Sequence, residues 1–287
     1  MSEKILIIGK GFLGEKLFSE FHDSGINVLG THYHKSDPII DITNIHSIEK
    51  ITHEFKPDFI INCAALTNLD QIESNPKRAY AINAYGAKNI AKVSRRNKIK
   101  MIHISTDSVF DGMEGMYHED DVPNPINEYA KSKKMGEDFV KETLDEHIII
   151  RTNFYGHNSE EKFLFNWILK KLKNKQQITG FSDVIFNPLE IRNVSSMISE
   201  LIYKDFNGII HLSSNEVITK YEFIMEITKM LNFDMELVIK GSIKNVNFIA
   251  KRPLNTSLSN HQAKNFLKTQ PLSLKNWLEN YNLINFR

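Results

Sequence analysis

Tyr129 and Lys133 are the residues of this sequence whose types and spacing best fit catalysis. They are four residues apart in a helical pattern and therefore share one face of a helix. An ammonium beside a phenol lowers its pKa, so that the phenol donates a proton more readily to the alkoxide formed when hydride adds to a ketone. Thr106, or Ser105 as second choice, would hold the ketone oxygen against the Tyr129 hydroxyl.

The Tyr-x-x-x-Lys spacing is weak evidence by itself. The chain has nine tyrosines and many lysines, so about one such spacing is expected by chance. The pair gains weight from its position, because it opens a helix predicted from 127 to 144, downstream of a strand at 101–105 that ends in serine and threonine. Polar residues at the carboxyl ends of parallel strands point into the ligand crevice.

A glycine-rich turn near the N-terminus is the element that must position a cofactor beside this pair. The apolar run 5–8 predicts a strand buried on both faces, and Gly9, Gly11 and Gly14 follow with the spacing G-x-G-x-x-G. Such a turn occurs in ordinary strand-to-helix connections, but an amphipathic helical pattern follows it here. A strand, a glycine turn and a helix N-terminus together predict a site for the diphosphate of a dinucleotide.

The end of the second predicted strand, 26–31, bears on which dinucleotide is used. Sites for NAD usually have a carboxylate there, which bonds the ribose 2′-hydroxyl. This chain reads Thr-His-Tyr-His-Lys at 31–35, with no carboxylate before Asp37. We therefore predict that NADP(H) is favoured and that NAD(H) is possible. His32 and His34 lack an evident third ligand, so no metal site is predicted.

The order of elements predicts an α/β fold. Buried strands at 59–65, 101–105 and 147–151 alternate with helical patterns, which favours a Rossmann-like, doubly wound parallel sheet. We assign residues 1–155 to the dinucleotide-binding domain and 156–287 to a smaller C-terminal substrate-binding lobe. The segment 190–214 is predicted to return to the first domain, so the boundaries are interleaved.

Composition excludes several classes of partner. The 287 residues carry a formal net charge of +1, with 41% hydrophobic and 25% charged residues, which predicts no general attraction to nucleic acid. No apolar run approaches the length of a membrane span. The single cysteine, Cys63, lies in an apolar run and reads as a small buried hydrophobe, in keeping with the cytoplasm. The acidic triplet 119–121 reads as solvated, and we expect a monomer or homodimer.

Taken together, these motifs resemble the extended short-chain dehydrogenases/reductases, and within them the dTDP-4-dehydrorhamnose reductase family. The resemblance runs nearly end to end. It rests on GKGFLG at 9–14, DIT at 41–43, NCAALT at 62–67, Asn83, STD at 105–107, VFDG at 109–112, YAKSK at 129–133, RT at 151–152, YG at 155–156 and RP at 252–253. Ser108 stands where the family usually has tyrosine, and Asn153-Phe154 where it often has Ser-Trp.

The resemblance implies roles for individual residues. The catalytic residues would be Thr106, Tyr129 and Lys133. The cofactor would be lined by Gly9, Gly11, Phe12, Leu13, Gly14, His32, Asp41, Ile42, Cys63, Ala64, Ala65, Asn83, Ser105, Tyr129 and Lys133. The substrate would be lined by Thr67, Asp107, Val109, Asn153 and Arg252.

The implied activity is NAD(P)H-dependent reduction of the C4 ketone of a nucleotide-activated 6-deoxy-4-keto-hexose, most simply dTDP-4-dehydro-L-rhamnose. The substrate is thus a small sugar nucleotide rather than a macromolecule. Two alternatives stay open: an epimerase or reductase of another sugar nucleotide, and a non-catalytic NADP-binding regulatory subunit resembling that of methionine adenosyltransferase. Because a fold hosts many functions, the site must decide between them.

Overall fold

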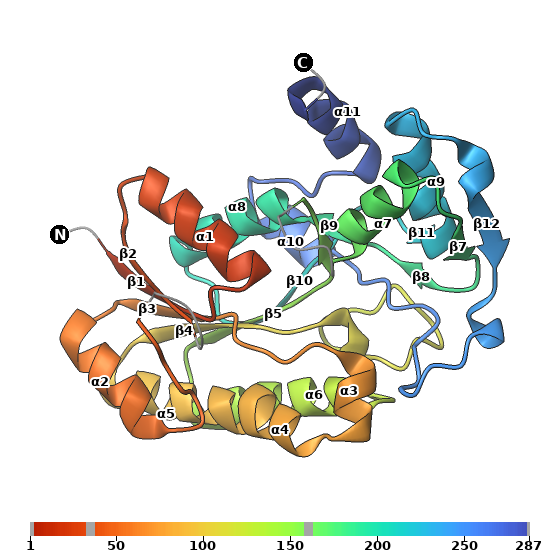
Figure 1. Ribbon diagram of the computed structural model, residues 1–287. Helices are drawn as coiled ribbons and strands as arrows, with labels where there is room; N and C mark the ends of the chain where they lie inside the picture. Colours follow the sequence, from red (N-terminus) through yellow and green to blue (C-terminus); the bar gives the residue numbers. More distant parts are fainter. Residues whose placement is uncertain (1–2, 33–37, 158–162, 286–287) are drawn as a thin grey trace.

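A six-stranded parallel sheet forms the centre of the protein (Figure 1). The computed structural model describes residues 3–32, 38–157 and 163–285, with side chains as far as 279. Across the sheet the strands are β10 (Gly208–Leu212), β5 (His147–Thr152), β4 (Lys100–Ile104), β3 (Phe59–Asn62), β1 (Lys4–Ile8) and β2 (Asn27–Thr31). Every neighbouring pair is parallel. The predicted Rossmann-like α/β fold is confirmed.

The strands are apolar on both faces because helices cover both. Ile5 and Ile7 point to one face and Leu6 and Ile8 to the other, and all four are fully buried. Successive side chains of a strand alternate between faces, so a continuous apolar run suits a two-sided sheet. The helices on one face are α1 (Phe12–Asp23) and α8 (Ile191–Ile202), and on the other α2 (Ile45–Phe55), α5 (Ala87–Asn97) and α6 (Glu128–Thr143) (Figure 1).

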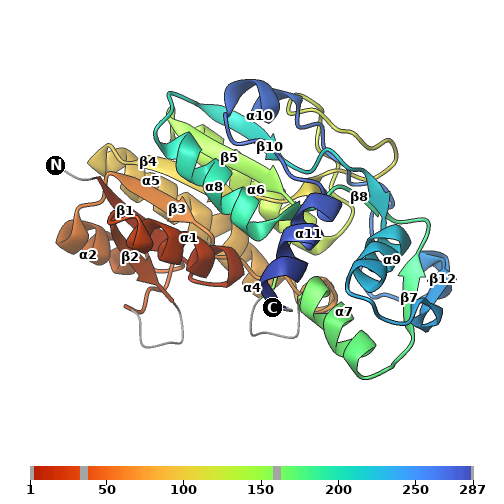
Figure 2. The ribbon, with the colours of Figure 1, turned by 90° about the horizontal axis from the view of Figure 1, so that it is seen from above.

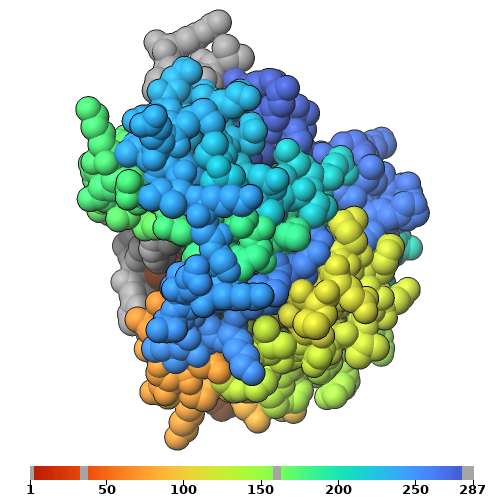
Figure 3. Space-filling model, turned by 90° about the vertical axis from the view of Figure 1, so that its right-hand side faces the viewer, coloured from red at the N-terminus to blue at the C-terminus, as the bar shows by residue number. Residues whose placement is uncertain are grey.

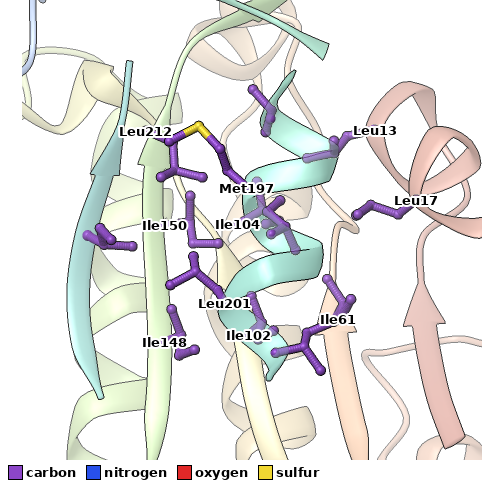
Figure 4. Close-up of a cluster of buried hydrophobic side chains, with 14 of the residues drawn as sticks. Leu13, Leu17, Ile61, Ile102, Ile104, Ile148, Ile150, Met197, Leu201 and Leu212 are labelled. Atoms are coloured by element: carbon purple, nitrogen blue, oxygen red, sulfur yellow. The ribbon is translucent and has the colours of Figure 1, made fainter. Parts of the chain in front are cut away.

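The larger core lies between the sheet and the helices α1 and α8. Figure 4 shows Met197 and Leu201 of α8 reaching toward the isoleucines of β4 and β5, such as Ile104 and Ile150. Leu17 of α1 approaches the same cluster from the side. This packing fixes the sheet ends on which the polar residues of the site stand.

A second group of elements lies beyond one end of the sheet (Figure 2). It has its own apolar cluster, rich in aromatic rings, that includes Tyr155, Phe165, Phe223 and Trp277. Its helices are α7 (Leu164–Lys173), α9 (Lys220–Met230) and α11 (Leu274–Asn285). Its short ladders pair β7 (Ile178–Phe181) with β12 (Val238–Gly241), β8 (Ile185–Phe186) with β11 (Ile218–Thr219), and β6 (Phe154–Tyr155) with β9 (Leu189–Glu190).

The chain passes more than once between the two groups. After β9 it enters α8 on the large sheet, and β10 then adds to the sheet edge beside β5. After the second group is complete, α10 (His261–Phe266) packs its Ala263 into the larger core. Figure 3 shows the blue C-terminal segments lying against the orange and yellow segments of the first half. The central sheet and its larger core are therefore completed by segments from the C-terminal half of the chain.

Some local expectations differ from the structure. The third strand ends at Asn62 rather than 65, because the Asn62 side chain accepts a hydrogen bond from the Ala64 N–H at 3.1 Å and turns the chain. Asn75 ends the short helix α3 (Leu69–Ser74). The next helix begins as α4 (Lys77–Ala79) and passes through a π-helical stretch, η1 (Tyr80–Gly86), before α5.

The remaining elements are short 3-10 turns, η2 (Asp107–Val109), η3 (Met235–Leu237) and η4 (Ile243–Asn245). Residues 33–37, which include His34 and the stretch used to predict cofactor preference, lie outside the described residues. Within the described ranges, no helix is long and apolar enough to cross a membrane.

Candidate active site

The glycine turn after β1 has the shape that a diphosphate site requires. Gly9 has a φ of +93°, and a Cβ there would lie 2.6 Å from the backbone of Ala64. A Cβ on Gly14 would lie 2.2 Å from the carbonyl oxygen of Gly9. Gly11 differs, because a Cβ on it would meet nothing within 4 Å. Two glycines thus permit close packing, and the third leaves open space at the N-terminus of α1.

A cleft of about 400 Å³ begins at this turn and contains the predicted catalytic residues. Thr106, Tyr129 and Lys133 all line it. The other predicted residues in its lining are Gly11, Phe12, Leu13, Gly14, Cys63, Ala65, Thr67, Ser105, Asp107 and Asn153. Residues from four strand ends and two helices therefore meet in one cleft.

Helix α6 carries Tyr129 and Lys133. The Asn127 side chain caps it by accepting a hydrogen bond from the Ala130 N–H at 2.9 Å, which fixes where the first turn begins. Tyr129, in that first turn, is partly buried, whereas Lys133 is 2% exposed. The Lys133 Nζ donates to the Ile104 carbonyl oxygen at 2.7 Å, which joins the helix to the end of β4.

The electrostatics of this pair differ from the expectation. Burial raises the pKa of Tyr129 to about 12, and a hydrogen bond with Thr106 lowers it only in part. Burial also lowers the pKa of Lys133 to about 8, against the charge of Glu137. Removal from water therefore dominates the pKa of Tyr129, and the expected net lowering of this pKa is not observed. The phenol is fully protonated at neutral pH, as a proton donor must be.

Asp107, next to Thr106, holds the wall of the cleft together. Its carboxylate is 2% exposed and accepts hydrogen bonds from Asn153 Nδ2 at 2.8 Å and Thr256 Oγ1 at 2.7 Å. Thr106 Oγ1 and Ser108 Oγ donate to its other oxygen, each at 3.1 Å. Three segments far apart in sequence are thereby joined at one carboxylate.

A buried ion pair lies behind the catalytic helix. Arg151 Nη2 donates to Glu137 at 2.8 Å, and both side chains are at most 2% exposed. Ser105 Oγ donates to the same carboxylate. Glu137 is four residues beyond Lys133, so this spacing was the signal by which it could have been found. The pair fixes Ser105 and, through it, the strand end that carries Thr106.

A further cavity, of about 750 Å³, has Glu137 and Arg151 in its lining, whereas the lining of the catalytic cleft contains neither residue. Its lining mixes acidic, basic and histidine side chains. Glu119 lies there partly buried and accepts a hydrogen bond from the His211 N–H at 2.9 Å, so only Asp120 and Asp121 of the acidic triplet are exposed. Among residues 3–32, 38–157 and 163–285, no group of three or more candidate ligands suits a metal ion.

Several residues predicted to line the cofactor lie outside the cleft lining. Gly9 and Ala64 form its supporting backbone contact. His32 forms an isolated bridge with Ile39, and Asp41 accepts hydrogen bonds from Thr43 within a turn.

Ile42 and Asn83 also support the site from outside its lining. The Ile42 side chain packs on Gly86, where a Cβ would come within 2.5 Å of it. Asn83, in the π-helical stretch, bonds both backbone groups of Leu66 and the Ser132 hydroxyl, at 2.8–3.0 Å. It thus fixes the loop after β3 against α6.

A second cavity of about 650 Å³ joins the cleft. The two share Leu69, Asp107, Ser108 and Asn153, and the second is walled largely by aromatic and apolar residues of the C-terminal group. Arg252 lines it, and its Nη2 lies 3.0 Å from Asp70.

Among the predicted substrate residues, Val109 is placed differently. It is fully buried in a small cluster with Phe110, Tyr117 and Leu258, away from both linings. Sequence reasoning also did not select Asp70, Thr256 and Lys220, which the fold brings to the second cavity or its wall. None of them has a local pattern that signals a site.

Cys63 lies in the cleft without the properties of a nucleophile. Burial raises the pKa of its thiol to about 12, and the charge of Lys133 offsets this only slightly. A thiol with a raised pKa is unreactive near neutral pH. The expected small buried hydrophobe is found only in part, because Cys63 packs against the larger core but is partly exposed to the cleft.

A nicotinamide dinucleotide fits the residues present. The open side of Gly11 and the first-turn N–H groups of α1 suit a diphosphate, and the cleft then runs to Tyr129 and Lys133. A parallel sheet that presents a lysine-paired tyrosine over the same cleft as a first-strand glycine turn is characteristic of the extended short-chain dehydrogenases/reductases. The protein is an oxidoreductase of this class.

Comparison with known proteins identifies the family to which the chain belongs. The family described as the RmlD substrate binding domain matches residues 3–283, and the chain belongs to this family. The "Probable low-salt glycan biosynthesis reductase Agl14" of Haloferax volcanii is 31% identical over 260 residues, which cover 86% of each chain. A methionine adenosyltransferase 2 subunit beta from Xenopus laevis is 30% identical over 246 residues, 80% of this chain and 73% of the relative.

Among solved structures, the dTDP-4-dehydrorhamnose reductase of Bacillus anthracis, in complex with NADP, superposes with a TM-score of 0.91. It is 31% identical, and the alignment covers 99% of both chains. The sequence-based prediction of the family is therefore confirmed.

Proposed function

We propose that the protein reduces the C4 ketone of a nucleotide-activated 6-deoxy-4-keto-hexose with NADPH, and that dTDP-4-dehydro-L-rhamnose is its substrate. One observation carries the proposal: the tyrosine–lysine pair, Thr106 and the glycine turn line a single cleft. That cleft opens into a second cavity large enough for the nucleotide part of such a substrate. The Bacillus anthracis reductase, similar over the whole chain, supports the choice of substrate.

In this mechanism the chain's own residues orient the ketone and supply the proton. Thr106 and Tyr129 hold the carbonyl oxygen, and the Tyr129 hydroxyl donates its proton to the oxygen as negative charge develops there. The Lys133 ammonium stabilises the resulting phenolate. The bound dinucleotide supplies the hydride. Binding energy from the remote nucleotide positions the sugar.

NADP(H) is proposed as the preferred cofactor. Support comes from the absence of a carboxylate between positions 31 and 36 of the sequence and from the NADP found with the Bacillus anthracis reductase. Michaelis constants for NADPH and NADH, measured at saturating sugar nucleotide, test this preference. A strong preference for NADH would contradict it.

The activity is tested by following absorbance at 340 nm with NADPH and a panel of 4-keto sugar nucleotides. We expect stoichiometric NADPH consumption with dTDP-4-dehydro-L-rhamnose and slower or no turnover with UDP-linked ketones. Product formation without net NADPH consumption would indicate an epimerase instead. No turnover with any member of the panel would contradict the proposal.

A second candidate follows from the similarity to the methionine adenosyltransferase 2 subunit beta. In that case the protein would bind NADP and regulate another enzyme without turning over a sugar. The Tyr129–Lys133 pair in the cleft favours catalysis, because dinucleotide binding alone does not require the proton donor that this pair provides. NADPH binding without turnover of the panel would favour the regulatory alternative.

A further inference from the structure

Lys220 is the feature of the second cavity that the proposed mechanism leaves unused. It is the first residue of α9 and lines the cavity together with Asp107, Ser108 and Arg252. Its Nζ lies 3.3 Å from the centroid of the Phe186 ring. The side chain is therefore directed inward over a buried ring, not outward into solvent.

The backbone on both sides of Lys220 is firmly fixed. Its N–H donates to the Val184 carbonyl oxygen at 2.8 Å. The preceding residue, Thr219, pairs with Ile185 in the β8–β11 ladder and forms a reciprocal capping box with Glu222. Such a cap holds the first turn of a helix in place. The position of the ammonium is thus set by the fold.

The ammonium lacks a direct anionic partner. Among the residues that the structure describes, no hydrogen bond or ion pair to the Lys220 Nζ is present. Asp107 is close enough to influence its charge, but four neutral donors, on Asn153, Thr256, Thr106 and Ser108, occupy the carboxylate. Burial lowers the pKa of Lys220 to about 7, and an amine without a hydrogen-bonded anion in such a place gains from an anionic ligand, which favours its charged form.

Arg252 provides a second, independent indication from the same cavity. Its Nη2 is paired with Asp70, but its Nη1 is buried without a hydrogen-bond partner in the described part of the chain. The guanidinium stacks at 4.8 Å over the ring of Phe248. Two cations of one cavity thus retain donors for a ligand.

The order of chemical groups along the joined cavities matches one class of molecule. The proton donor lies in the cleft, Ser108 and Asp107 mark the junction, and the cations and the aromatic walls follow in the second cavity. A sugar nucleotide has a ketone at one end, then a diphosphate, then a nucleoside. The joined cavities therefore present the proton donor, the cations and the aromatic walls in the order in which a sugar nucleotide presents its ketone, diphosphate and nucleoside.

We infer that Lys220 binds the diphosphate of the nucleotide sugar and thereby sets selectivity for diphosphate-linked substrates. The inference rests on the proposed function and assigns a residue to substrate recognition. Lys220 touches the remote handle rather than the ketone. Its loss should therefore raise KM and leave kcat nearly unchanged, the behaviour of a residue that binds ground and transition states equally.

The test compares Lys220→Met with Lys220→Arg in the full-length protein saturated with NADP+. Methionine preserves the apolar stem over Phe186 and removes the charge, whereas arginine keeps the charge. Lys229→Met, at an exposed position of the same helix, is the matched control. Calorimetry measures the dissociation constants of dTDP, UDP and thymidine for each protein.

We expect Lys220→Met to weaken dTDP binding by about 10- to 100-fold, the value of a charge-assisted hydrogen bond, and to leave thymidine binding unchanged. Lys220→Arg should stay within a few-fold of the wild type, and Lys229→Met should match it. Wild-type dTDP affinity in Lys220→Met would overturn the inference, as would an equal loss for thymidine.

The same proteins separate this inference from the proposed function. If the wild type binds dTDP through Lys220 but reduces no 4-keto sugar, the reductase proposal fails and the diphosphate site stands. If Lys220→Met reduces dTDP-4-dehydro-L-rhamnose with an unchanged KM, the diphosphate assignment fails and the reductase stands. Failure of the wild type to bind either nucleoside diphosphate would overturn the assignment as well.

Discussion

The catalytic cleft and the aromatic cavity that adjoins it are built in different ways. In the cleft, the reactive side chains come from strand ends of the central sheet and from the N-terminal parts of the helices α1 and α6 that cover it. In the second cavity, the polar side chains come from segments as far apart as Asp107 and Arg252, joined by tertiary hydrogen bonds. Regular strands and helices position the catalytic side chains. The side chains of the second cavity are positioned by contacts between distant segments of the chain.

This difference predicts different responses to substitution. A change in the cleft should act on kcat, because the groups there contact the reacting atoms. A change in the second cavity should act on KM, because the groups there hold the remote part of the substrate. Four substitutions and one change of pH test this contrast, and the opposite kinetic signature in any of them would contradict it.

Tyr129→Phe should have the largest effect. Removing the proton donor should lower kcat by about 10³-fold, within the range for general acid catalysis, and leave the affinity for NADPH unchanged. Steady-state rates at 340 nm and a fluorescence titration with NADPH measure the two quantities. Tyr203→Phe, 58% exposed, is the control. A variant with wild-type kcat would show that this phenol donates no proton.

Alkaline pH should have the next largest effect. The pKa of Lys133 is lowered to about 8 by burial, so its positive charge is lost as pH rises through that value. Because only the charged form stabilises the phenolate, kcat/KM should fall about tenfold per pH unit above pH 8, or about 100-fold by pH 10.

Replacing Glu137 should shift the pH at which kcat/KM begins to fall, because the negative charge of Glu137 raises the pKa of Lys133. Glu137→Gln removes that charge, so the fall should move to lower pH. Asp138→Asn, at the partly exposed neighbouring position, should leave it in place. A profile that stays flat to pH 10, or a shift to higher pH in Glu137→Gln, would contradict the role assigned to Lys133.

Asp70→Asn should produce a smaller change, confined to substrate affinity. The carboxylate holds both the Arg252 guanidinium at 3.0 Å and the Ala250 N–H at 3.0 Å. Weakening this pair should raise the KM for the sugar nucleotide by about 3- to 10-fold and leave kcat unchanged. The effect is small because the pair is partly exposed to solvent. Asp23→Asn, at a position 80% exposed, is the control. A fall in kcat alone would break the contrast between the two cavities.

Phe186→Leu should give the smallest kinetic effect. The ring under the Lys220 ammonium would be lost, and a cation–π contact of this kind predicts a rise in KM of about threefold. Phe165→Leu, in the same buried cluster, should cost similar stability without changing KM. Thermal unfolding and steady-state kinetics of both variants measure this. Equal changes in KM would show that the ring acts through packing alone.

The sequence predicted the cleft better than the second cavity for a physical reason. Periodicity and glycine spacing report on strands, turns and helix faces, so Gly9, Gly11 and the Tyr129–Lys133 pair were accessible from local pattern. Glu137 was accessible from the same helical spacing. Asp70 and Lys220 are ordinary charged residues in sequence, and only the folded chain brings Lys220 into the second cavity and Asp70 to the Arg252 of its lining.

The electrostatics of the cleft were also beyond local pattern. The four-residue spacing of Tyr129 and Lys133 indicates proximity, but not how far each group is removed from water. In the structure, that removal dominates both pKa values. The return of the chain to the sheet at 190–214 was visible as an apolar strand pattern, whereas the later packing of α10 against the same core was not.

The position of β10 has a consequence for synthesis on the ribosome. This strand completes the edge of the central sheet, yet it ends only at Leu212 of 287 residues, after much of the other group has been made. Until it emerges, β5 presents an unpaired edge of the kind that invites association between nascent chains. The half-made sheet therefore exposes this edge from the synthesis of β5 until that of β10, and association between nascent chains has to be prevented during that interval.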